Sequence, residues 1–328
     1  MTIRTAIIGL GIMGRRMLEH LEKHPHYTVT AIWDPDKGAC DAALTLAPDA
    51  RLVPSADAAI QAADLVYLAC PPIPRKTYAL AAAASGKAIF LEKPLGVDVA
   101  ESRDMVERLK AFDVPVAVNF TQAAGAALAD TGSAVKAGDL GDLVGADIIL
   151  TYAQWPRGWQ QTADWLRFRS EGGMTREVIS HFLFFSERIL GPLTLVWSQP
   201  DYPLDQDLCE THIAARLTSA QGQIVTVMGS IGGAQPDRQE LTIKGAKASR
   251  RVSDFYRDAQ STGGDFTALH KDDADPRAVS LKAQLDDLAL LCAGKPNRLA
   301  TLDEALRVQV LVEAMLAGHR TKSDATTA

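Results

Sequence analysis

Short apolar segments alternate with amphipathic segments through the N-terminal third of the chain. Residues 3–22 contain an apolar strand, a glycine-rich turn and an amphipathic helix, and residues 27–34 have the pattern of a second strand. The alternation then continues with strands predicted at 63–72, 87–94 and 114–120 and helices predicted at 75–86 and 98–113. This order of elements predicts an α/β fold with a Rossmann-type, doubly wound parallel sheet.

The second half of the chain has a different pattern. Residues 207–219, 222–233 and 238–245 alternate apolar and polar side chains, as strands of a half-buried sheet do. The segment "SAQGQ" between the first two is typical of a hairpin turn. We therefore expect these segments to be strands of a second sheet.

Composition excludes several classes of partner. The 328 residues, 47% of them hydrophobic, suffice for two domains with separate cores. A net charge of −6 argues against a nucleic-acid or anionic-membrane surface. Neither a cleavable leader nor the roughly 18 apolar residues of a membrane span are recognisable, so we expect a cytoplasmic protein.

Metal-binding patterns are not recognisable either. The four cysteines, Cys40, Cys70, Cys209 and Cys292, are far apart, which is typical of reduced thiols rather than of a zinc site. We therefore expect no metal.

The glycine turn has the spacing of a dinucleotide-binding loop. Gly9, Gly11 and Gly14 fit the pattern GxGxxG where a strand meets a helix, and Ile12 and Met13 lie at the helix start. Asp34 follows Gly14 by twenty residues (34 − 14), at the end of the second strand. A carboxylate there accepts hydrogen bonds from the ribose hydroxyls.

Asp34 also favours NAD over NADP. A 2′-phosphate would place like charges beside this carboxylate, at a cost of roughly 4 kcal/mol per pair of unit charges about 4 Å apart. The segment "PDKGAC" that follows contains Lys37 as its only cation.

Several further motifs resemble one family. They are the early GxGxxG, "YLACPP" (67–72), "IFLEKPLG" (89–96) and "VKAGDLGDLVGADIIL" (135–150), with a closing segment at 280–315. Together they resemble the Gfo/Idh/MocA family, named after glucose-fructose oxidoreductase and inositol dehydrogenase. The resemblance implies an NAD-binding Rossmann domain at 1–120 and a domain for substrate binding and oligomerisation at 121–320, with closing helices at about 279–318. It implies that the second domain is a C-terminal α/β domain with an open, mostly antiparallel sheet, which agrees with the strand pattern of 207–245. It also implies a homo-oligomer, a dimer or tetramer, formed through the C-terminal sheet. Residues 321–328 are expected to form a flexible tail.

The family resemblance assigns candidate residues at the strand ends. In the family the lysine of the EKP motif lies by the nicotinamide and contacts the reacting hydroxyl, and this lysine corresponds to Lys93. An ammonium group there can stabilise a developing alkoxide and pass a proton. Glu92 is expected to fix Lys93 or the backbone. The cofactor-binding set at these ends is completed by Pro71, Pro72 and Asn119.

The stretch "EGGMTREVISH" (171–181) is predicted to begin a helix. Members of the family have a glycine-rich turn there, then an aspartate and a histidine four residues later, which correspond to Glu177 and His181. The two side chains share one helix face. We expect both to be catalytic or to contact substrate, and Gly172 and Gly173 to let a ligand approach the backbone closely. The alternative is a core histidine, because its neighbours are apolar.

Tryptophans and arginines are concentrated in residues 152–169. Aromatic faces suit sugar C–H surfaces and guanidinium groups suit an anionic substituent, so we expect Trp155, Trp159, Trp165 and Arg167 to contact substrate. The alternative is a loop whose tryptophans pack on the sheet or on another subunit. Arg75, near the place where many family members have a histidine, indicates a pocket that differs from a standard inositol or glucose site.

Three functions remain open from the sequence. The first is an NAD-dependent oxidoreductase that acts on a hydroxyl or carbonyl of a sugar, cyclic polyol or sugar acid, with Lys93 and His181 handling the proton. The second is a reductase of a C=N or other C=O substrate with an anionic group. The third is a catalytically silent NAD-binding sensor or regulator, against which Lys93 and His181 argue.

Overall fold

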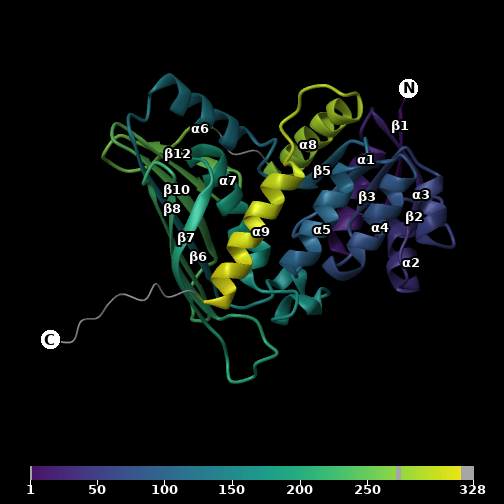
Figure 1. Cartoon of the computed structure of the whole chain (residues 1–328), viewed down its shortest axis with the longest axis horizontal. Coiled ribbons are helices and arrows are strands. Elements are labelled where there is room, and N and C mark those ends of the chain that lie inside the picture. The colour runs from purple at the N-terminus through teal and green to yellow at the C-terminus, as the bar shows by residue number, and fades with distance from the viewer. Residues whose placement is uncertain (1, 271–274, 319–328) are drawn as a thin grey trace. The chain divides into compact units, whose positions relative to one another are not determined.

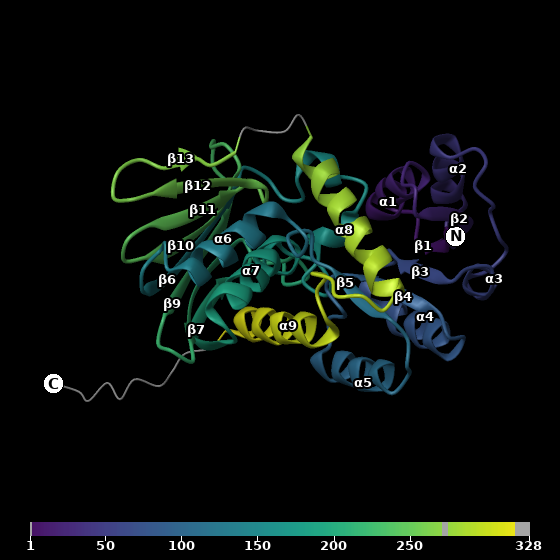
Figure 2. The ribbon, with the colours of Figure 1, turned by 90° about the horizontal axis from the view of Figure 1, so that it is seen from above.

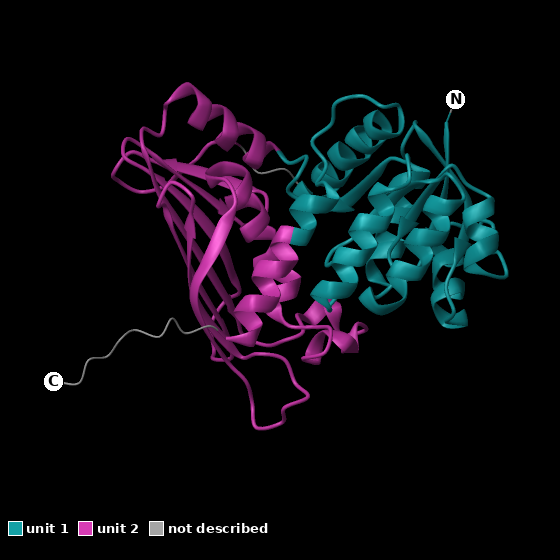
Figure 3. Cartoon of the chain, viewed as in Figure 1, with its two compact units in different colours: residues 1–125, 273–306 teal, residues 126–272, 307–328 magenta. Residues whose placement is uncertain are grey.

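The computed structural model describes residues 2–270 and 275–318, which form two compact units (Figure 3). The first unit comprises residues 1–125 and 273–306, and the second comprises residues 126–272 and 307–328. The tail predicted at 321–328 lies outside the described residues. The first unit contains a later segment, 273–306, that the sequence analysis placed in the second domain.

The first unit contains a five-stranded parallel sheet in the order β2-β1-β3-β4-β5 (Figure 1). Its central strands are apolar and buried along their length, as strands covered on both faces are. Every strand was predicted, and the doubly wound fold is confirmed. The strands are β1 (Ile3–Ile8), β2 (Tyr27–Trp33), β3 (Leu65–Leu68), β4 (Ala88–Glu92) and β5 (Val116–Asn119).

Helices cover both faces of this sheet. Figure 2 shows α1, α2 and α8 on one face and α4 and α5 on the other. Side chains of Asp36, Ser55 and Asp98 cap the starts of α2, α3 and α5 by accepting backbone N–H groups. The helices are α1 (Ile12–Glu22), α2 (Lys37–Leu46), α3 (Ala56–Gln61), α4 (Pro72–Ala84), α5 (Val99–Lys110) and α8 (Pro276–Cys292).

Helix α8 belongs to the first unit because its apolar face completes that unit's core. Leu281, Leu285 and Leu288 are buried in one cluster with Met17 of α1. The hydroxyl of Tyr27 donates to the carbonyl of Leu285 over 2.6 Å. Sequence order alone placed this helix in the second domain, whereas its contacts place it on the Rossmann sheet.

The second unit contains an eight-stranded sheet in the order β13-β12-β11-β10-β6-β9-β8-β7. Only the pair β6 and β9 is parallel, so the prediction of a mostly antiparallel sheet is confirmed. The predicted hairpin is the β8–β9 pair. The strands are β6 (Leu143–Tyr152), β7 (Leu193–Asp201), β8 (His212–Ser219), β9 (Ile224–Ile231), β10 (Arg238–Gly245), β11 (Ser249–Ser253), β12 (Arg257–Ser261) and β13 (Thr267–Ala268).

The helical segments of the second unit include the buried α7, which lies against the sheet (Figure 2). Helix α9 begins in the first unit and ends in the second, since the boundary follows Leu306. The segments are α6 (Ala126–Ala137), the short 3₁₀ turns η1 (Gly158–Gln160) and η2 (Asp164–Arg167), the π-helix η3 (Thr175–Ile179), α7 (Ser180–Leu190) and α9 (Leu302–Ala317). No helix among the described residues is long and apolar enough to cross a membrane.

Candidate functional site

The glycine turn between β1 and α1 is shaped so that only glycine fits at two positions. Gly9 has a φ of +98°, and a Cβ there would lie 2.5 Å from the Cys70 nitrogen. A Cβ at Gly14 would lie 1.9 Å from the Gly9 carbonyl oxygen. Gly11, in contrast, faces open space and begins α1 without a capping side chain. The first N–H groups of the helix, next to Ile12 and Met13, are therefore suited to an anionic ligand.

Asp34 braces this turn. Its Oδ2 accepts the Leu10 N–H over 2.7 Å, and its Oδ1 accepts the Asp36 N–H over 2.8 Å. Each carboxylate oxygen can accept a further hydrogen bond, so a ribose hydroxyl can still be bound. Arg15, which the sequence analysis did not select, donates from Nη1 to the Leu10 carbonyl over 2.6 Å and adds a cation beside the turn. The glycine cradle and this carboxylate fit a dinucleotide.

Glu92 lies at the carboxyl end of β4 in a buried polar cluster. Its Oε1 accepts the hydroxyl of Tyr67 and, over 2.7 Å, the side-chain amide of Asn119, its register partner on β5. Burial raises the pKa of the Glu92 carboxyl, while Tyr67 and the charges of Lys93 and Arg75 oppose that shift. The Oδ1 atom of Asn119 is buried and accepts no hydrogen bond within the described part of the chain, which leaves an acceptor for a bound ligand.

Arg75 fixes the backbone on both sides of Lys93. Its side chain is 2% exposed, and its guanidinium donates to the carbonyls of Glu92 (2.8 Å) and Pro94 from Nη1 and to that of Cys70 (2.6 Å) from Nη2. Arg75 is therefore a buried clamp on the EKP segment. The sequence analysis treated it as a marker of the substrate pocket, because the direction of its side chain was not known.

Lys93 follows directly after β4 and is half-buried. Pro72 is buried at the start of α4, and the exposed Pro71 precedes it. The helix thus begins three residues before its predicted start at 75, since proline is favourable in the first helical turn. Lys93, Pro71 and Pro72 all lie at the carboxyl ends of β3 and β4, where open parallel sheets bind ligands.

In the second unit, "EGGMTREVISH" forms a π-helix followed by an α-helix. Glu177 lies within η3 and is half-buried, whereas His181 lies in the first turn of α7 and is 6% exposed. The sequence analysis expected an ordinary helix here. A π-helical turn is rare, and such turns are frequent at functional sites.

The glycine pair before η3 packs tightly against protein groups. A Cβ at Gly172 would lie 2.3 Å from the Leu166 carbonyl oxygen, and one at Gly173 would lie 2.4 Å from Oε2 of Glu210. The same carboxylate accepts the Thr175 N–H over 2.8 Å, and burial raises its pKa. Glu210 therefore holds the start of the π-helix, and Gly173 leaves room for its carboxylate.

Arg157 connects the tryptophan-rich stretch to Glu177. The Arg157 Nε donates to Gln160 over 2.8 Å, and Gln160 donates to Oε1 of Glu177 over 3.0 Å. Nη2 of Arg157 lies 3.5 Å from the same oxygen. The guanidinium also lies over the Trp155 and Trp159 rings, 4.7 Å from the latter's centroid. A buried cation thus stabilises the negative charge of Glu177.

The remaining candidates of this stretch differ in burial: Trp155 and Trp165 are half-buried, whereas Trp159 and Arg167 are exposed. Trp155 is half-buried, and its indole N–H donates to the Leu166 carbonyl over 2.9 Å. Arg167 points outward, with its side chain 51% exposed and 3.3 Å from Asp164. Trp165 is half-buried, and Trp159 is 44% exposed. The sequence could not tell the buried Arg157 from the exposed Arg167.

Phe255 packs against the edge of the His181 ring. The two ring centroids are 5.3 Å apart and the rings nearly perpendicular, while Phe182 stacks on the same phenyl ring. Asp254 and Phe255, in the turn between β11 and β12, have φ values of +50° and +69°. Such a conformation costs about 1–2 kcal/mol per non-glycine residue. The surrounding packing therefore holds Phe255 against the histidine despite this cost.

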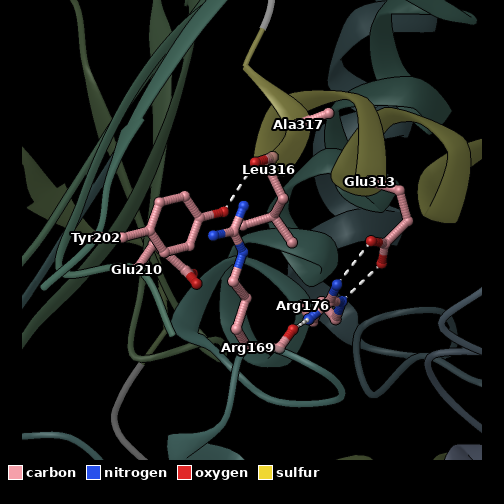
Figure 4. A pocket seen from close by; sticks show the side chains of 7 residues that line it. All are labelled: Arg169, Arg176, Tyr202, Glu210, Glu313, Leu316 and Ala317. Carbon is pink, nitrogen blue, oxygen red and sulfur yellow. Dashed lines mark hydrogen bonds and ion pairs between the residues drawn. The ribbon is translucent and has the colours of Figure 1, made fainter. Parts of the chain in front are cut away.

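A small cavity of about 210 Å³ lies beside the start of the π-helix (Figure 4). Arg176 pairs with Glu313 through two bonds of 2.6 and 2.7 Å, and the Arg169 guanidinium lies 3.9 Å from the centre of the Tyr202 ring. The cavity is lined by Arg169, Arg176, Tyr202, Glu210, Glu313, Leu316 and Ala317. The pairing with Glu313 anchors Arg176, the residue before Glu177.

The first unit thus has the architecture of a nucleotide-binding oxidoreductase domain: a parallel sheet, a glycine cradle, and a lysine after a carboxyl strand end. Residues 3–120 match the oxidoreductase family with an NAD-binding Rossmann fold, Gfo/Idh/MocA. The match is confined to residues 3–120, and over this region it confirms the predicted resemblance to that family.

Individual relatives extend this comparison. The chain is 34% identical over 120 residues to an inositol 2-dehydrogenase of Cereibacter sphaeroides, and the aligned region spans about a third (34%) of each chain. A 2,7-anhydro-N-acetylneuraminate hydratase of Escherichia coli is 22% identical over 80% of this chain and 69% of its own. An oxidoreductase from Agrobacterium radiobacter, solved with NAD⁺, L-tartaric acid and magnesium, superposes with a TM-score of 0.82 at 16% identity, covering 97% of each chain. This last similarity concerns the fold alone.

Proposed function

We propose that this chain is an NAD-dependent dehydrogenase that transfers hydride between nicotinamide and a hydroxyl or carbonyl of a sugar, cyclic polyol or sugar acid. The observation that carries the proposal is Lys93, whose flanking carbonyls are held by the buried Arg75 directly after β4. The family match and the similarity to an inositol 2-dehydrogenase support the same class of substrate.

The residues of this chain have distinct roles in the proposal. Bound NAD supplies the hydride acceptor. The N–H groups of the turn at Gly9, Gly11, Ile12, Met13 and Gly14 would hold its pyrophosphate, Asp34 would hold its ribose, and the residues at the strand ends would hold its nicotinamide end. Those strand-end residues are Pro71, Pro72, Glu92, Lys93 and Asn119. Lys93 stabilises the developing alkoxide and His181 takes or returns the hydroxyl proton.

Glu177 and the aromatic side chains complete the proposed substrate site. Glu177, held by Gln160 and near Arg157, orients His181 or a substrate hydroxyl. Trp155, Trp159, Trp165 and Arg167 contact the substrate. A reductase of a C=N or other C=O compound with an anionic group is the second candidate, favoured by the buried guanidinium of Arg157 beside Glu177.

The experiment combines a substrate panel with four variants. Turnover is followed by NADH absorbance for Lys93→Ala, His181→Ala, the double variant and Glu177→Gln, beside NAD titrations and thermal melts. Each alanine variant should lose about 10² to 10⁴ in kcat with near-normal NAD affinity. The double variant should be little worse than the worse single one, because residues that act as a unit are not additive.

Two results would contradict this proposal. If His181→Ala keeps full kcat but melts at a far lower temperature, His181 is a core residue. If the unmodified protein binds NAD tightly yet turns over no substrate of the panel, a sensor or regulator explains the chain better.

A further inference from the structure

Three side chains from distant parts of the second unit converge near one edge of its sheet. Asp130 comes from α6, Asp258 from β12, and His270 follows β13, the last strand of the sheet. The His270 Nε2 lies 2.9 Å from Oδ2 of Asp130 and 3.8 Å from Oδ2 of Asp258. One nitrogen and two carboxylate oxygens all lie within 4.8 Å of one another.

Asp258 is the unusual member of this cluster. It is 5% exposed, and its Oδ2 accepts no hydrogen bond within the described ranges 2–270 and 275–318. The nearest nitrogen atoms of His270, at 3.8 Å, and of Arg250, at 4.0 Å, are beyond hydrogen-bonding distance of this oxygen. A buried carboxylate oxygen without a partner is costly. The side chain of Asp258 also places an oxygen within 4.8 Å of the ligand atoms of Asp130 and His270.

From this geometry we infer that Asp130, Asp258 and His270 form a binding site for one divalent cation of the zinc class. Zinc ligands at about 2.0–2.2 Å in a tetrahedron are roughly 3.3–3.6 Å apart, and the distances of 2.9 and 3.8 Å lie on either side of that range. Imidazole with carboxylates suits Zn²⁺ better than Mg²⁺ or Ca²⁺, which prefer oxygen ligands alone. Water would complete the coordination.

The charges near the site favour a cation despite one arginine. Two carboxylates face the site, and the Arg250 guanidinium, 4.0 Å from Asp258, offsets one of them. A bound ion would connect α6 to the edge strands β12 and β13 and supply the partner that Oδ2 of Asp258 lacks. The sequence analysis expected no metal, because it found no local metal-binding motif. The three ligands form none, since 128 (258 − 130) and 12 (270 − 258) residues separate them.

Titration of the whole, chelator-treated protein with Zn²⁺ tests this inference. Calorimetry should show one site, and Co²⁺ should give the intense visible absorption of tetrahedral coordination. Asp130→Asn, Asp258→Asn and His270→Ala should each weaken Zn²⁺ binding at least about 10-fold, by analogy with the 10–100-fold loss that even outer-shell changes cause. His212→Ala removes another exposed histidine of the same unit and should bind Zn²⁺ normally.

The inference is overturned if the unmodified protein binds no Zn²⁺, or if the cluster variants bind it as the unmodified protein does. In the second case the ion binds elsewhere, and the cluster contains only a hydrogen bond between His270 and Asp130. Because Asp258→Asn alters a buried position, circular dichroism checks its fold, and Asp130→Asn, at a more exposed position, gives an independent reading. None of these outcomes depends on NAD or on a substrate.

Discussion

Replacing Arg75 by methionine should unfold the EKP segment locally and displace Lys93. Methionine keeps most of the aliphatic volume but removes the charge and every donor. Three carbonyls, those of Cys70, Glu92 and Pro94, then lose their partner. The bonds to Cys70 and Glu92 are buried, and each unpaired buried group costs about 1–3 kcal/mol. The partly buried Pro94 carbonyl adds a smaller cost.

The expected loss of unfolding free energy is about 3 kcal/mol, at the lower end of the summed range. We choose the lower end because the variant no longer buries a guanidinium. Arg75→Lys keeps the charge, but one ammonium cannot reproduce the fork geometry that reaches carbonyls of two separate segments. Its loss should therefore be intermediate. A shift of Lys93 by about 1 Å would lower kcat by up to about 10².

Urea unfolding and steady-state kinetics, both below the melting temperature of every variant, measure the two effects. Leu109→Ala in α5 is the matched control, because its side chain is 1% exposed and its truncation costs about 2–5 kcal/mol. Arg75→Met and Leu109→Ala should both lose stability, and only Arg75→Met should lose kcat. If Arg75→Met and Leu109→Ala have the same kcat, Arg75 does not position Lys93. If the stability of Arg75→Met is unchanged, the hydrogen bonds of Arg75 do not hold the EKP segment.

Three further outcomes are expected. NAD should bind more tightly than NADP, and Asp34→Ala should reduce the difference between the two affinities in titrations of both cofactors. Equal affinities in the unmodified protein would contradict the preference for NAD assigned to Asp34. Trp159→Ala or Arg167→Ala should raise KM without changing the oligomer in sedimentation runs, whereas altered assembly with normal kinetics would favour a packing role. Burial raises the pKa of Glu92 above its ordinary 4.5 in the folded state, so its ionisation opposes folding as pH rises through that higher pKa. Glu92→Gln should therefore gain stability relative to the unmodified protein above pH 4.5, and a pH-independent difference in urea unfolding would contradict this.

Much of the fold could be predicted because local pattern and topology agree. The apolar strands and GxGxxG define the Rossmann sheet, since few other folds place a glycine turn between a buried strand and a helix. Strands β11 to β13 were not recognised, because segments such as "RDAQS" have no apolar alternation. Helix α8 was placed in the second domain because its sequence neighbours are there, whereas its leucines pack on α1.

Less of the candidate site could be predicted, because the residues that hold it in place are recognised only from the directions of their side chains. Arg75, Arg157 and Arg167 look alike in a sequence, yet the first two are buried and the third is exposed. Phe255 lies 74 residues after His181 (255 − 181), and no local motif connects them. The π-helix depends on a shift of backbone hydrogen bonds that propensity does not encode.

That π-helix has a consequence for how this site could have arisen. A π-helical turn in a longer helix corresponds to one extra residue inserted into an α-helix. Loss of one residue between Thr175 and Ile179 would restore a regular helix and turn Glu177 about 100° away from Gln160, while His181 and the rest of α7 kept their places. The acid could thus be gained or lost in a single insertion or deletion, independently of the histidine. A relative with one residue fewer in this turn would keep the fold, but its acidic side chain would no longer face the site.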